Sequence, residues 1–505
     1  METITKINDE EIEFSILKDI PLAFVKGNMF LPLRRHDGEL LAAVAGNRGM
    51  FALRDLARKL NLKPRPLQAD ESLIIETINR IYSQTSRVDE VMGDIKGEDL
   101  SMIATEFESP KDLLELTEEA PIIRLLNAVL MEAVKENASD IHIEPYEKGI
   151  DVRFRVDGIL NKVLAPPKII HDALISRLKI LAGLDIAEKR LPQDGRIKLL
   201  IGGKDIDIRV SIIPTAMGER AVLRLLDRKA GVLSLEMIGL SDSILAKFKQ
   251  NLTRPNGIIL VTGPTGSGKT TTLYSSLLKL NTEERNIITV EDPVEYQLTG
   301  IGQMQVNPKI GLTFASGLRS ILRQDPDIMM VGEIRDLETA EIAVHASLTG
   351  HLVLSTLHTN DAPGAIARLI DMGIEPFLVA SSLICIVAQR LVRVICPHCR
   401  EPHEPSDQEL IYLNVDYPPK RIYRAKGCDK CMGKGYLGRT AIYELLEITP
   451  DIRAMIVDRK ETQFLKSVAL NSGFRTLQSN AVEKILDGTT TIEEVMRVTQ
   501  KDIDE

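Results

Sequence analysis

The sequence feature that most constrains the fold is the stretch GIILVTGPTGSGKTTT at residues 257–272. Its apolar beginning has the length of a buried strand, and the pattern Gly-x4-Gly-Lys-Thr follows at once. Glycines at this spacing let backbone N–H groups curl around phosphate oxygens, and a helix that begins near Lys269 adds the positive end of its dipole. The stretch therefore predicts a strand, a phosphate-binding loop and a helix in succession.

This loop predicts Mg²⁺-dependent binding of ATP. Lys269 is expected to reach the β and γ phosphate oxygens, and the hydroxyl group of Thr270 is an expected ligand of Mg²⁺. We expect the remaining nucleotide contacts from Gly263, Pro264, Thr265, Gly266, Ser267, Gly268 and Thr271. The alternative is a glycine-rich turn that binds nothing, and the strand before the loop and the helix after it argue against that alternative.

Three further apolar runs have the length of buried strands and lie at residues 287–290, 328–331 and 352–357. Each is followed by a helix or a loop. This alternation predicts an α/β fold with a mostly parallel sheet, in which active residues lie at the carboxyl ends of the strands.

Polar side chains follow these runs: Glu291, Glu333 and His358. Phosphoryl transfer needs a bound Mg²⁺ and a water molecule positioned in line. We predict Glu291 as the base, and Glu333, expected beside the phosphate-loop strand, as the support of Mg²⁺ and its water. For each glutamate the alternative is an ordinary surface carboxylate at a strand end. His358 is either a contact to the γ-phosphate or a satisfied turn residue.

Four of the five cysteines form two CxxC pairs, Cys396 with Cys399 and Cys428 with Cys431. Four thiolates suit tetrahedral Zn²⁺ and leave no open position, so the predicted role of the metal is structural. The spacing of 28 residues between the pairs exceeds the commonest ones, and the alternative is redox-active or idle thiols. 

Composition excludes several classes of protein. A net charge of −9 gives no overall cationic field for nucleic acid or anionic lipid, and aromatic residues make up only 4% with no Trp, which argues against a stacking platform for single strands. The first fourteen residues lack the pattern of a secretory signal. No apolar run reaches the roughly 18 residues that a membrane span needs. We therefore expect a cytoplasmic protein that does not bind nucleic acid.

A chain of 505 residues is too long for one ordinary domain. Residues 84–120 contain eleven Asp or Glu against three Lys or Arg, the composition of an exposed linker. We predict a small α/β domain over residues 1–83 and a middle domain over residues 121–240. The catalytic domain is expected over residues 241–505, with the cysteine-containing insert at 396–431.

The middle domain shows strand alternation. In DVRFRVDG, Val152, Phe154 and Val156 share one face, and Asp157–Gly158 is a hairpin signal. In DIDIRVS the apolar side chains again alternate with polar ones, so Arg209 is expected opposite the apolar face. For Arg224 the alternation is ambiguous, because apolar residues occupy both faces of its segment.

Together these residues resemble the secretion ATPase superfamily, whose members power type II secretion, pilus extension and pilus retraction. The resemblance covers about residues 120–500. It includes the loop GPTGSGKT, an aspartate box at 288–297, a glutamate-ended Walker B at 327–335, a histidine box at 349–361, SDIHIEP at 139–145, RLPQDGRI at 190–197 and GERAVLRLLD at 218–227. The segment IPLAFVKGN at 20–28 looks like the type II secretion members.

The resemblance implies a RecA-like P-loop catalytic domain with a parallel-rich sheet, preceded by an α+β, PAS-like middle domain. It implies a homo-hexamer in which arginines of the middle domain, here Arg209 and Arg224, reach the phosphates. It supports zinc in the insert. It also implies two partners, the cytoplasmic domain of the inner-membrane secretion protein L and the inner-membrane platform protein F, and hence a peripheral place at the inner membrane.

The sequence thus predicts an ATP hydrolase that powers pseudopilus assembly and protein export by a type II secretion system. The alternative within the same class is a motor for assembly or retraction of a type IV pilus. The alternative from another class is a helicase-like nucleic-acid motor.

Overall fold

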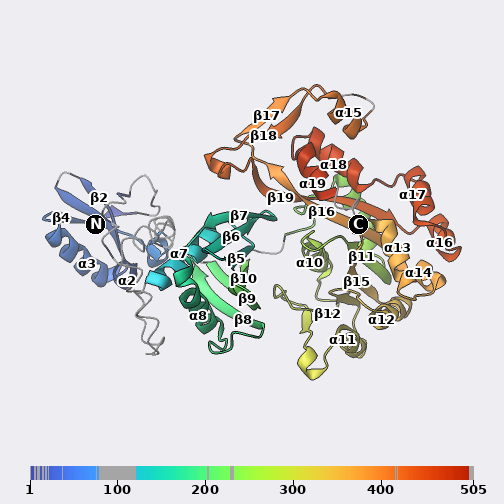
Figure 1. Cartoon of the computed structure of the whole chain (residues 1–505), viewed down its shortest axis with the longest axis horizontal. Helices are drawn as coiled ribbons and strands as arrows, with labels where there is room; N and C mark the ends of the chain where they lie inside the picture. The colour runs from blue at the N-terminus through green and yellow to red at the C-terminus, as the bar shows by residue number, and fades with distance from the viewer. Residues whose placement is uncertain are drawn as a thin grey trace. The chain divides into compact units, whose positions relative to one another are not determined.

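A computed structural model describes most of residues 2–78 and 121–499 (Figure 1). The residues outside the description are 1, 5–6, 8–11, 14–15, 17–19, 21, 37, 76, 79–120, 202–203, 228–232, 416, 418 and 500–505. The predicted acidic linker therefore lies outside the described residues. The chain divides into two compact units, Met1–Ala230 and Gly231–Glu505, and each is described by itself.

The N-terminal part is a small α/β domain, as predicted. Its four-stranded sheet has the order β1-β4-β3-β2. The elements are β1 (Glu2–Thr3), α2 (Leu22–Gly27), β2 (Phe30–His36), β3 (Glu39–Val44), α3 (Gly46–Lys59) and β4 (Lys63–Gln68). Side chains of β2 and β3 and of one face of α3, including Phe30, Leu40 and Leu53, form its core.

The middle part is a six-stranded sheet with the order β7-β6-β5-β10-β9-β8, and all its pairs are antiparallel. The elements are α7 (Pro121–Lys135), β5 (Asp140–Pro145), β6 (Ile150–Val156), β7 (Ile159–Leu164), a 3₁₀ turn (Lys168–Ile170), α8 (His171–Ala182), β8 (Gln193–Ile201), β9 (Lys204–Thr215) and β10 (Gly218–Asp227). Helices α7 and α8 share one hydrophobic core with one face of this sheet.

The predicted alternation is confirmed in this sheet. Val152, Phe154 and Val156 of β6 are buried, while the residues between them are half-buried. The hairpin between β6 and β7 turns at Asp157 and Gly158, whose φ angles are 50° and 84°. Positive φ at both central residues is the requirement of a type I′ turn.

The second unit is built on a seven-stranded sheet with the order β13-β12-β14-β15-β11-β16-β19. Its elements up to the centre of the sheet are α9 (Asp242–Leu252), β11 (Gly257–Thr262), α10 (Lys269–Leu280), β12 (Ile287–Glu291), β13 (Gly302–Gln305), a 3₁₀ turn (Pro308–Ile310), α11 (Phe314–Ile321), β14 (Ile328–Val331), α12 (Leu337–Leu348) and β15 (Leu352–Leu357). The predicted parallel sheet is confirmed by the register of β11, β12, β14 and β15.

The rest of the unit completes the sheet and covers it. The elements are α13 (Ala362–Asp371), α14 (Pro376–Ser382), β16 (Leu383–Ile395), β17 (Arg400–His403), α15 (Asp407–Leu413), β18 (Ile422–Ala425), a 3₁₀ turn (Asp429–Cys431), β19 (Tyr436–Glu447), α16 (Pro450–Val457), α17 (Thr462–Asn471), α18 (Leu477–Leu486) and α19 (Ile492–Thr499). Strand β19 is antiparallel to β16. Figure 1 shows β17, β18 and α15 extending from the far ends of these two strands as an arm.

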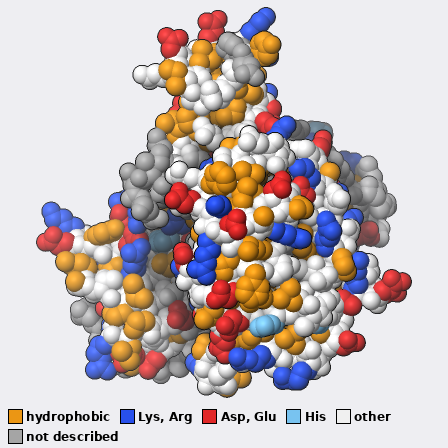
Figure 2. Space-filling model, turned by 90° about the vertical axis from the view of Figure 1, so that its right-hand side faces the viewer, with side chains coloured by type: hydrophobic (Ala, Val, Ile, Leu, Met, Phe, Trp, Pro, Cys, Tyr) orange, Lys and Arg blue, Asp and Glu red, His pale blue; other side chains and the backbone are white. Residues whose placement is uncertain are grey.

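Two hydrophobic cores sandwich the catalytic sheet. One contains residues of α11 to α14 and α16 to α19, and the other contains residues of α9 and α10. Leu235, Ile238 and Leu240 also pack in the second core. No helix among the described residues is long and apolar enough to cross a membrane. On the face shown in Figure 2, acidic and basic side chains are interspersed.

Candidate nucleotide-binding site

The phosphate-binding loop joins β11 to α10, as predicted. Gly263, Gly266 and Gly268 have φ angles of 143°, 79° and 89°, which other residues rarely adopt. At Gly263 a Cβ atom would lie only 2.4 Å from the carbonyl oxygen of Gln389 on β16. The loop conformation therefore depends on glycine both for its backbone angles and for the close approach of a neighbouring strand.

Lys269 is the first residue of α10. Its Nζ donates hydrogen bonds to the carbonyl oxygens of Gly263 at 2.7 Å and Pro264 at 3.1 Å. Burial lowers the pKa of Lys269 to about 8, with a further lowering by Arg390 and an opposing effect of Glu333. A lysine held in this way is ready to gain from a phosphate group, because the phosphate charge offsets the cost of its desolvation.

The other predicted nucleotide contacts lie where the sequence places them along the loop. Thr270 is half-buried in the first turn of α10. Thr271 follows it and is exposed, as are Pro264, Thr265 and Gly266 at the tip of the loop. Ser267 is 3% exposed, and its backbone N–H donates to the carbonyl oxygen of Pro264 at 3.2 Å.

Glu291 ends β12 and is 3% exposed. Its Oε2 accepts a short hydrogen bond from the hydroxyl group of Tyr274. Its Oε1 accepts hydrogen bonds from Thr289 Oγ1 at 2.5 Å and from Gln303 Nε2 at 3.1 Å. Both oxygens of the predicted base are therefore already bound by groups on α10, β12 and β13.

Glu333 follows β14 and has a partly exposed side chain. His358 Nε2 lies 3.2 Å from its Oε2, and Arg335 forms an ion pair with its Oε1. Burial raises the pKa of Glu333, but the hydrogen bonds and charges of Arg335 and His358 outweigh it, and the pKa lies below the usual range. Glu333 is therefore ionised at neutral pH and oriented by the Arg335 guanidinium group and the His358 ring.

The predicted place of Glu333 beside the phosphate-loop strand is wrong in one respect. Strand β15 lies between β14 and β11. The neighbour of the phosphate-loop strand is therefore the strand that ends at His358, and Glu333 reaches His358 from one strand further away. Apolar runs predict buried parallel strands but do not predict the order of these strands in the sheet, because all of them have the same continuous apolar pattern.

Two buried polar residues next to the loop were not predicted. Gln389 and Arg390 are 1% and 4% exposed on β16. Gln389 hydrogen bonds to the backbone of Ser267 and to the side chain of Thr272. The available signal was a polar pair inside the apolar run ICIVAQRLVRVI, because a buried polar residue must have partners.

Arg209 and Arg224 lie on the middle sheet. The register pairs Arg209 of β9 with Arg196 of β8 and with Arg224 of β10, Arg224 with Asp140 of β5, and Asp140 with Arg155 of β6. Direct cross-strand partners share a face, so these five residues form one row, called the arginine row below. Arg224 Nε donates to Asp140 Oδ1 at 3.0 Å and keeps 60% of its side chain exposed.

The four predicted metal-binding cysteines come together at the base of the arm. The sulfur atoms of Cys396 and Cys428 are 4.0 Å apart, and those of Cys399 and Cys431 are 3.8 Å apart. Tetrahedral zinc with bonds of about 2.3 Å places its sulfur ligands about 3.8 Å apart. All four sulfurs lie within 4.8 Å of one another. The cluster therefore fits a structural zinc ion.

The environment of this cluster acts on its thiols in opposite directions: burial raises the pKa of the Cys399 thiol to about 12, whereas backbone donors favour a thiolate at Cys431. Burial raises the pKa of the Cys431 thiol, but backbone N–H groups of Cys428 and Gly435 lower it to about 7. Those N–H groups lie 3.2 Å and 3.1 Å from the sulfur. Metal binding requires thiolates, and these donors favour one. Cys385, in contrast, is buried in the core of the catalytic unit, where its burial raises the thiol pKa.

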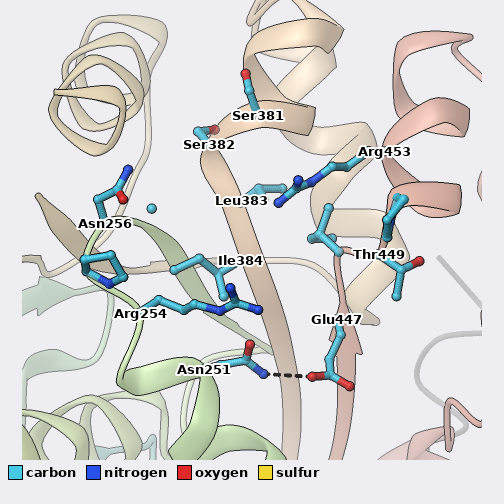
Figure 3. Close-up of a pocket in the computed structure, with 14 residues that line it drawn as sticks. Asn251, Arg254, Asn256, Ser381, Ser382, Leu383, Ile384, Glu447, Thr449 and Arg453 are labelled. Carbon is cyan, nitrogen blue, oxygen red and sulfur yellow. Dashed lines mark hydrogen bonds between the residues drawn. The ribbon is translucent and has the colours of Figure 1, made fainter. Parts of the chain in front are cut away.

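A separate pocket of about 580 Å³ lies at the opposite edge of the catalytic sheet, where β11 and β16 begin (Figure 3). Figure 3 shows Arg254 extending alongside Ile384, Arg453 extending toward Leu383, and Asn251 bound to Glu447, with a hydrogen bond of 3.1 Å. Since the phosphate-binding loop follows the carboxyl end of β11, this pocket is distinct from the nucleotide site.

Comparison with known proteins agrees with the geometry. The family described as Type II/IV secretion system protein matches residues 115–497, and the MshEN domain family matches residues 3–88. The chain is 52% identical to a type II secretion system protein E of Pseudomonas aeruginosa, over 96% of each chain. It is 45% identical to the type IV pilus assembly ATPase PilB of Myxococcus xanthus, over 98% of this chain and 88% of that one.

Among solved structures, the pilus retraction motor PilT with bound ADP superposes with a TM-score of 0.52 and 27% identity. The match covers 75% of this chain and 98% of PilT. This likeness confirms the predicted RecA-like catalytic fold. The predicted activity, hydrolysis of ATP at a P-loop with Mg²⁺, is confirmed by the same relatives. The chain therefore belongs to the type II/IV secretion system protein family.

Proposed function

We propose that this ATPase powers pseudopilus assembly and protein export by a type II secretion system. The observation that carries the proposal is its likeness to the type II secretion system protein E of Pseudomonas aeruginosa, which extends over 96% of both chains and so includes the N-terminal domain. Hydrolysis of ATP to ADP and phosphate would supply the work. Members of this family work with inner-membrane proteins.

In the proposed site the loop residues 263–271 bind the phosphates, with Lys269 on the β and γ oxygens. The hydroxyl group of Thr270 holds Mg²⁺. Glu333, ionised beside His358, supports the Mg²⁺ water shell, and His358 is placed to contact the γ-phosphate. These roles rest on charge and position at the carboxyl edge of the sheet.

We assign the role of base to Glu291. The Tyr274 hydroxyl group now occupies Glu291 Oε2, so the carboxylate must exchange this donor for the attacking water before it can take a proton. Tyr274 is thus proposed to hold the base away from water until nucleotide binds.

The working form is proposed to be a homo-hexamer with nucleotide between the middle domain (residues 121–240) and the catalytic domain (residues 241–505). Arg209 and Arg224 would then meet the phosphates as charge develops in the transition state. The exposure of Arg224, the half-buried place of Arg209 on the same polar face, and their adjacency in the arginine row support this role. The zinc-binding insert at 396–431 is proposed to be structural.

Residues 1–83 are proposed to dock on the cytoplasmic domain of the inner-membrane secretion protein L, with residues 84–120 as a tether. The platform protein F is the proposed second contact. Attachment through protein rather than lipid follows from the net charge of −9, which gives no reason to adhere to anionic lipid. The protein is then cytoplasmic and peripheral at the inner membrane.

Deletion of residues 1–83 tests this proposal. We expect the truncated chain to keep most of its basal ATP turnover, to leave the membrane fraction and to stop secretion in cells that contain the secretion protein L. The control is the full chain in the same cells. Truncated protein that still sediments with membranes only when the secretion protein L is present would contradict the docking role of residues 1–83.

The second candidate is a motor for a type IV pilus. It is favoured by the likeness to PilB, which covers 98% of this chain. Binding assays with the first 100 residues as bait separate the two: we expect capture of the secretion protein L, whereas capture of a pilus inner-membrane protein would support the pilus motor.

A further inference from the structure

Gln389 lies on β16, the strand beside the phosphate-binding loop. Its side chain binds the chain on both sides of Lys269, at Ser267 and at Thr272. Strand β16 is parallel to β11, and its register places Ala388 opposite Thr262, the last residue of β11. Gln389 therefore lies level with Gly263, where the loop begins. The close approach of the Gln389 carbonyl oxygen to the position of a Cβ at Gly263 reflects this placement.

Both the nitrogen and the oxygen of the Gln389 side-chain amide form hydrogen bonds. Its Nε2 donates to the carbonyl oxygen of Ser267 at 2.7 Å, and its Oε1 accepts from the hydroxyl group of Thr272 at 2.7 Å. The orientation of the amide is fixed, because the Ser267 carbonyl can only accept. Ser267 and Thr272 stand on either side of Lys269 and Thr270 in the sequence.

The Gln389 amide also packs closely against Gly268, the last glycine of the loop. A Cβ at Gly268 would lie 3.1 Å from Gln389 Nε2. Since Gln389 is only 1% exposed, water cannot replace its hydrogen bonds. Without the amide, the Ser267 carbonyl and the Thr272 hydroxyl group would each lose a hydrogen bond in a buried place, which is costly.

We infer that Gln389 is a positioning residue for nucleotide binding: it holds the phosphate-binding loop in its binding conformation by clamping Ser267 and Thr272. This inference deepens the proposed nucleotide site and rests on it. Gln389 touches no phosphate. It acts by raising the fraction of chains whose loop is ready to bind, and a lower fraction weakens apparent affinity in proportion.

The inference makes a distinct kinetic prediction. Once nucleotide is bound, its phosphates hold the loop, so a variant without the clamp should raise KM for ATP and Kd for ADP but keep most of kcat. Gln389→Leu should weaken ADP binding about tenfold, equivalent to about 1.4 kcal/mol, and lower kcat at saturating ATP by less than about threefold. Lys269→Ala, in contrast, should lose turnover itself.

Asn251 offers a matched control for lost stability. It is a buried amide on α9 that donates to Glu447 Oε1 at 3.1 Å, at the edge of the catalytic sheet opposite the loop. Asn251→Leu should lower the unfolding temperature as Gln389→Leu does, yet leave the affinity for ADP unchanged. An equal loss of ADP affinity in both variants would show that the effect of Gln389 is only general destabilisation, and would overturn the inference.

The variant Gln389→Glu tests the donor at Nε2 separately and serves if Gln389→Leu does not fold. A buried carboxyl group has a raised pKa. When protonated, it can donate to the Ser267 carbonyl and accept from Thr272 as the amide does. When ionised, it offers only acceptors and repels that carbonyl. We therefore expect near-normal ADP binding at low pH and a progressive loss as pH rises.

ADP affinity of full-length Gln389→Glu and wild type should be measured from about pH 5.5 to about pH 8.5, the range in which a buried carboxyl group titrates. At each pH, the ADP affinity of the variant is divided by that of wild type. Because both proteins contain Lys269, this ratio removes the effect of its titration. A ratio that falls at least about fivefold with rising pH supports the clamp. A pH-independent ratio would overturn it. If Lys269→Ala kept wild-type turnover, the proposed site itself would fail, whatever Gln389 does.

Discussion

The two larger sheets of this protein place charged groups in opposite ways. The catalytic sheet is mostly parallel and has a hydrophobic core on each side. Its central strands β11, β14 and β15 are therefore buried along their length, and Lys269, Glu333 and His358 lie in the segments that follow their ends. The middle sheet is antiparallel and has helices on one face, so its polar groups stand along the other face, in the middle of the strands. The arginine row crosses five adjacent strands in this way.

This difference indicates different tasks. At a parallel strand end, loop N–H groups, Lys269, Glu333 and His358 converge on one small place, which suits a fixed site for a ligand. On the antiparallel face, Arg209 and Arg224 are direct cross-strand partners in the middle of β9 and β10. We therefore expect the strand-end group to govern binding and hydrolysis, and the arginine row to govern hydrolysis alone.

The largest expected effect comes from the strand-end group. Lys269→Ala should lower ATP turnover by about a thousandfold or more, because a phosphate-charge contact contributes several kcal/mol in the transition state. The measurement is phosphate release by the full chain at saturating Mg·ATP, with thermal unfolding to confirm that the variant is folded. Turnover at the wild-type rate by a folded Lys269→Ala protein would remove the loop from the mechanism.

Next in size is the arginine row. Arg209→Ala and Arg224→Ala should each lower kcat by up to about a thousandfold, the scale known for arginines in phosphoryl transfer. Their affinity for ADP should change by less than about threefold, since the charge they meet develops only during transfer. Arg153→Ala is the control on the same sheet, because Arg153 lies outside the arginine row and its guanidinium group is bound to Glu144 at 2.7 Å, with half the side-chain exposure of Arg224. Unchanged kcat in both variants would exclude the middle domain from hydrolysis.

The pH dependence of nucleotide binding should be smaller. Burial gives Lys269 a pKa of about 8, and the protonated form binds phosphate. ADP affinity should therefore be constant well below pH 8 and should fall as pH rises through about 8, by up to about tenfold per pH unit. Lys269→Arg stays charged, so any binding it retains should show no such fall. An affinity that rises with pH above 8 would contradict this role of Lys269.

The smallest effect on the nucleotide site should come from the cysteine cluster. Purified protein should contain about one zinc ion per chain, by the four-thiolate stoichiometry. Replacing Cys396 and Cys428 with serine should release the metal and destabilise residues 396–431 locally. ADP affinity should stay within about twofold of wild type, because the cluster has four ligands and no contact with nucleotide.

Elemental analysis of protein purified without chelator tests the zinc content directly. Protein without metal would count against the site. A large loss of ADP affinity in the cysteine variants would show that the arm and the nucleotide site are one cooperative unit.

Local signals predicted much of this structure. The glycine spacing at 263–268 predicted the phosphate-binding loop, and the alternation in Val152–Val156 predicted which face of that strand is buried. Both predictions were correct because each depends only on residues close together in the sequence. The order of the catalytic strands was not, because β14 and β15 are equally apolar. Gln389 was missed because its partners, Ser267 and Thr272, are more than a hundred residues away.

The arginine row shows the same limit. Alternation placed Arg209 on the polar face but left Arg224 ambiguous, since Val222 and Leu226 share its face. Only the pairing of β9 with β10 puts the two arginines side by side, and pairing register between strands depends on the whole sheet. The cysteine cluster was predictable because each CxxC pair is recognised from adjacent residues. Two such pairs supply the four thiolates that tetrahedral zinc requires.

The claim that the two sheets divide binding from hydrolysis has one direct measurement. ADP and ADP with aluminium fluoride, a mimic of the transferred phosphoryl group, should be titrated with Mg²⁺ into wild type and the double variant Arg209→Ala, Arg224→Ala. We predict equal ADP affinity in both proteins, within about threefold, and a loss of at least about a hundredfold for the transition-state mimic in the double variant. Equal loss for both ligands, or no loss for the mimic, would contradict the account.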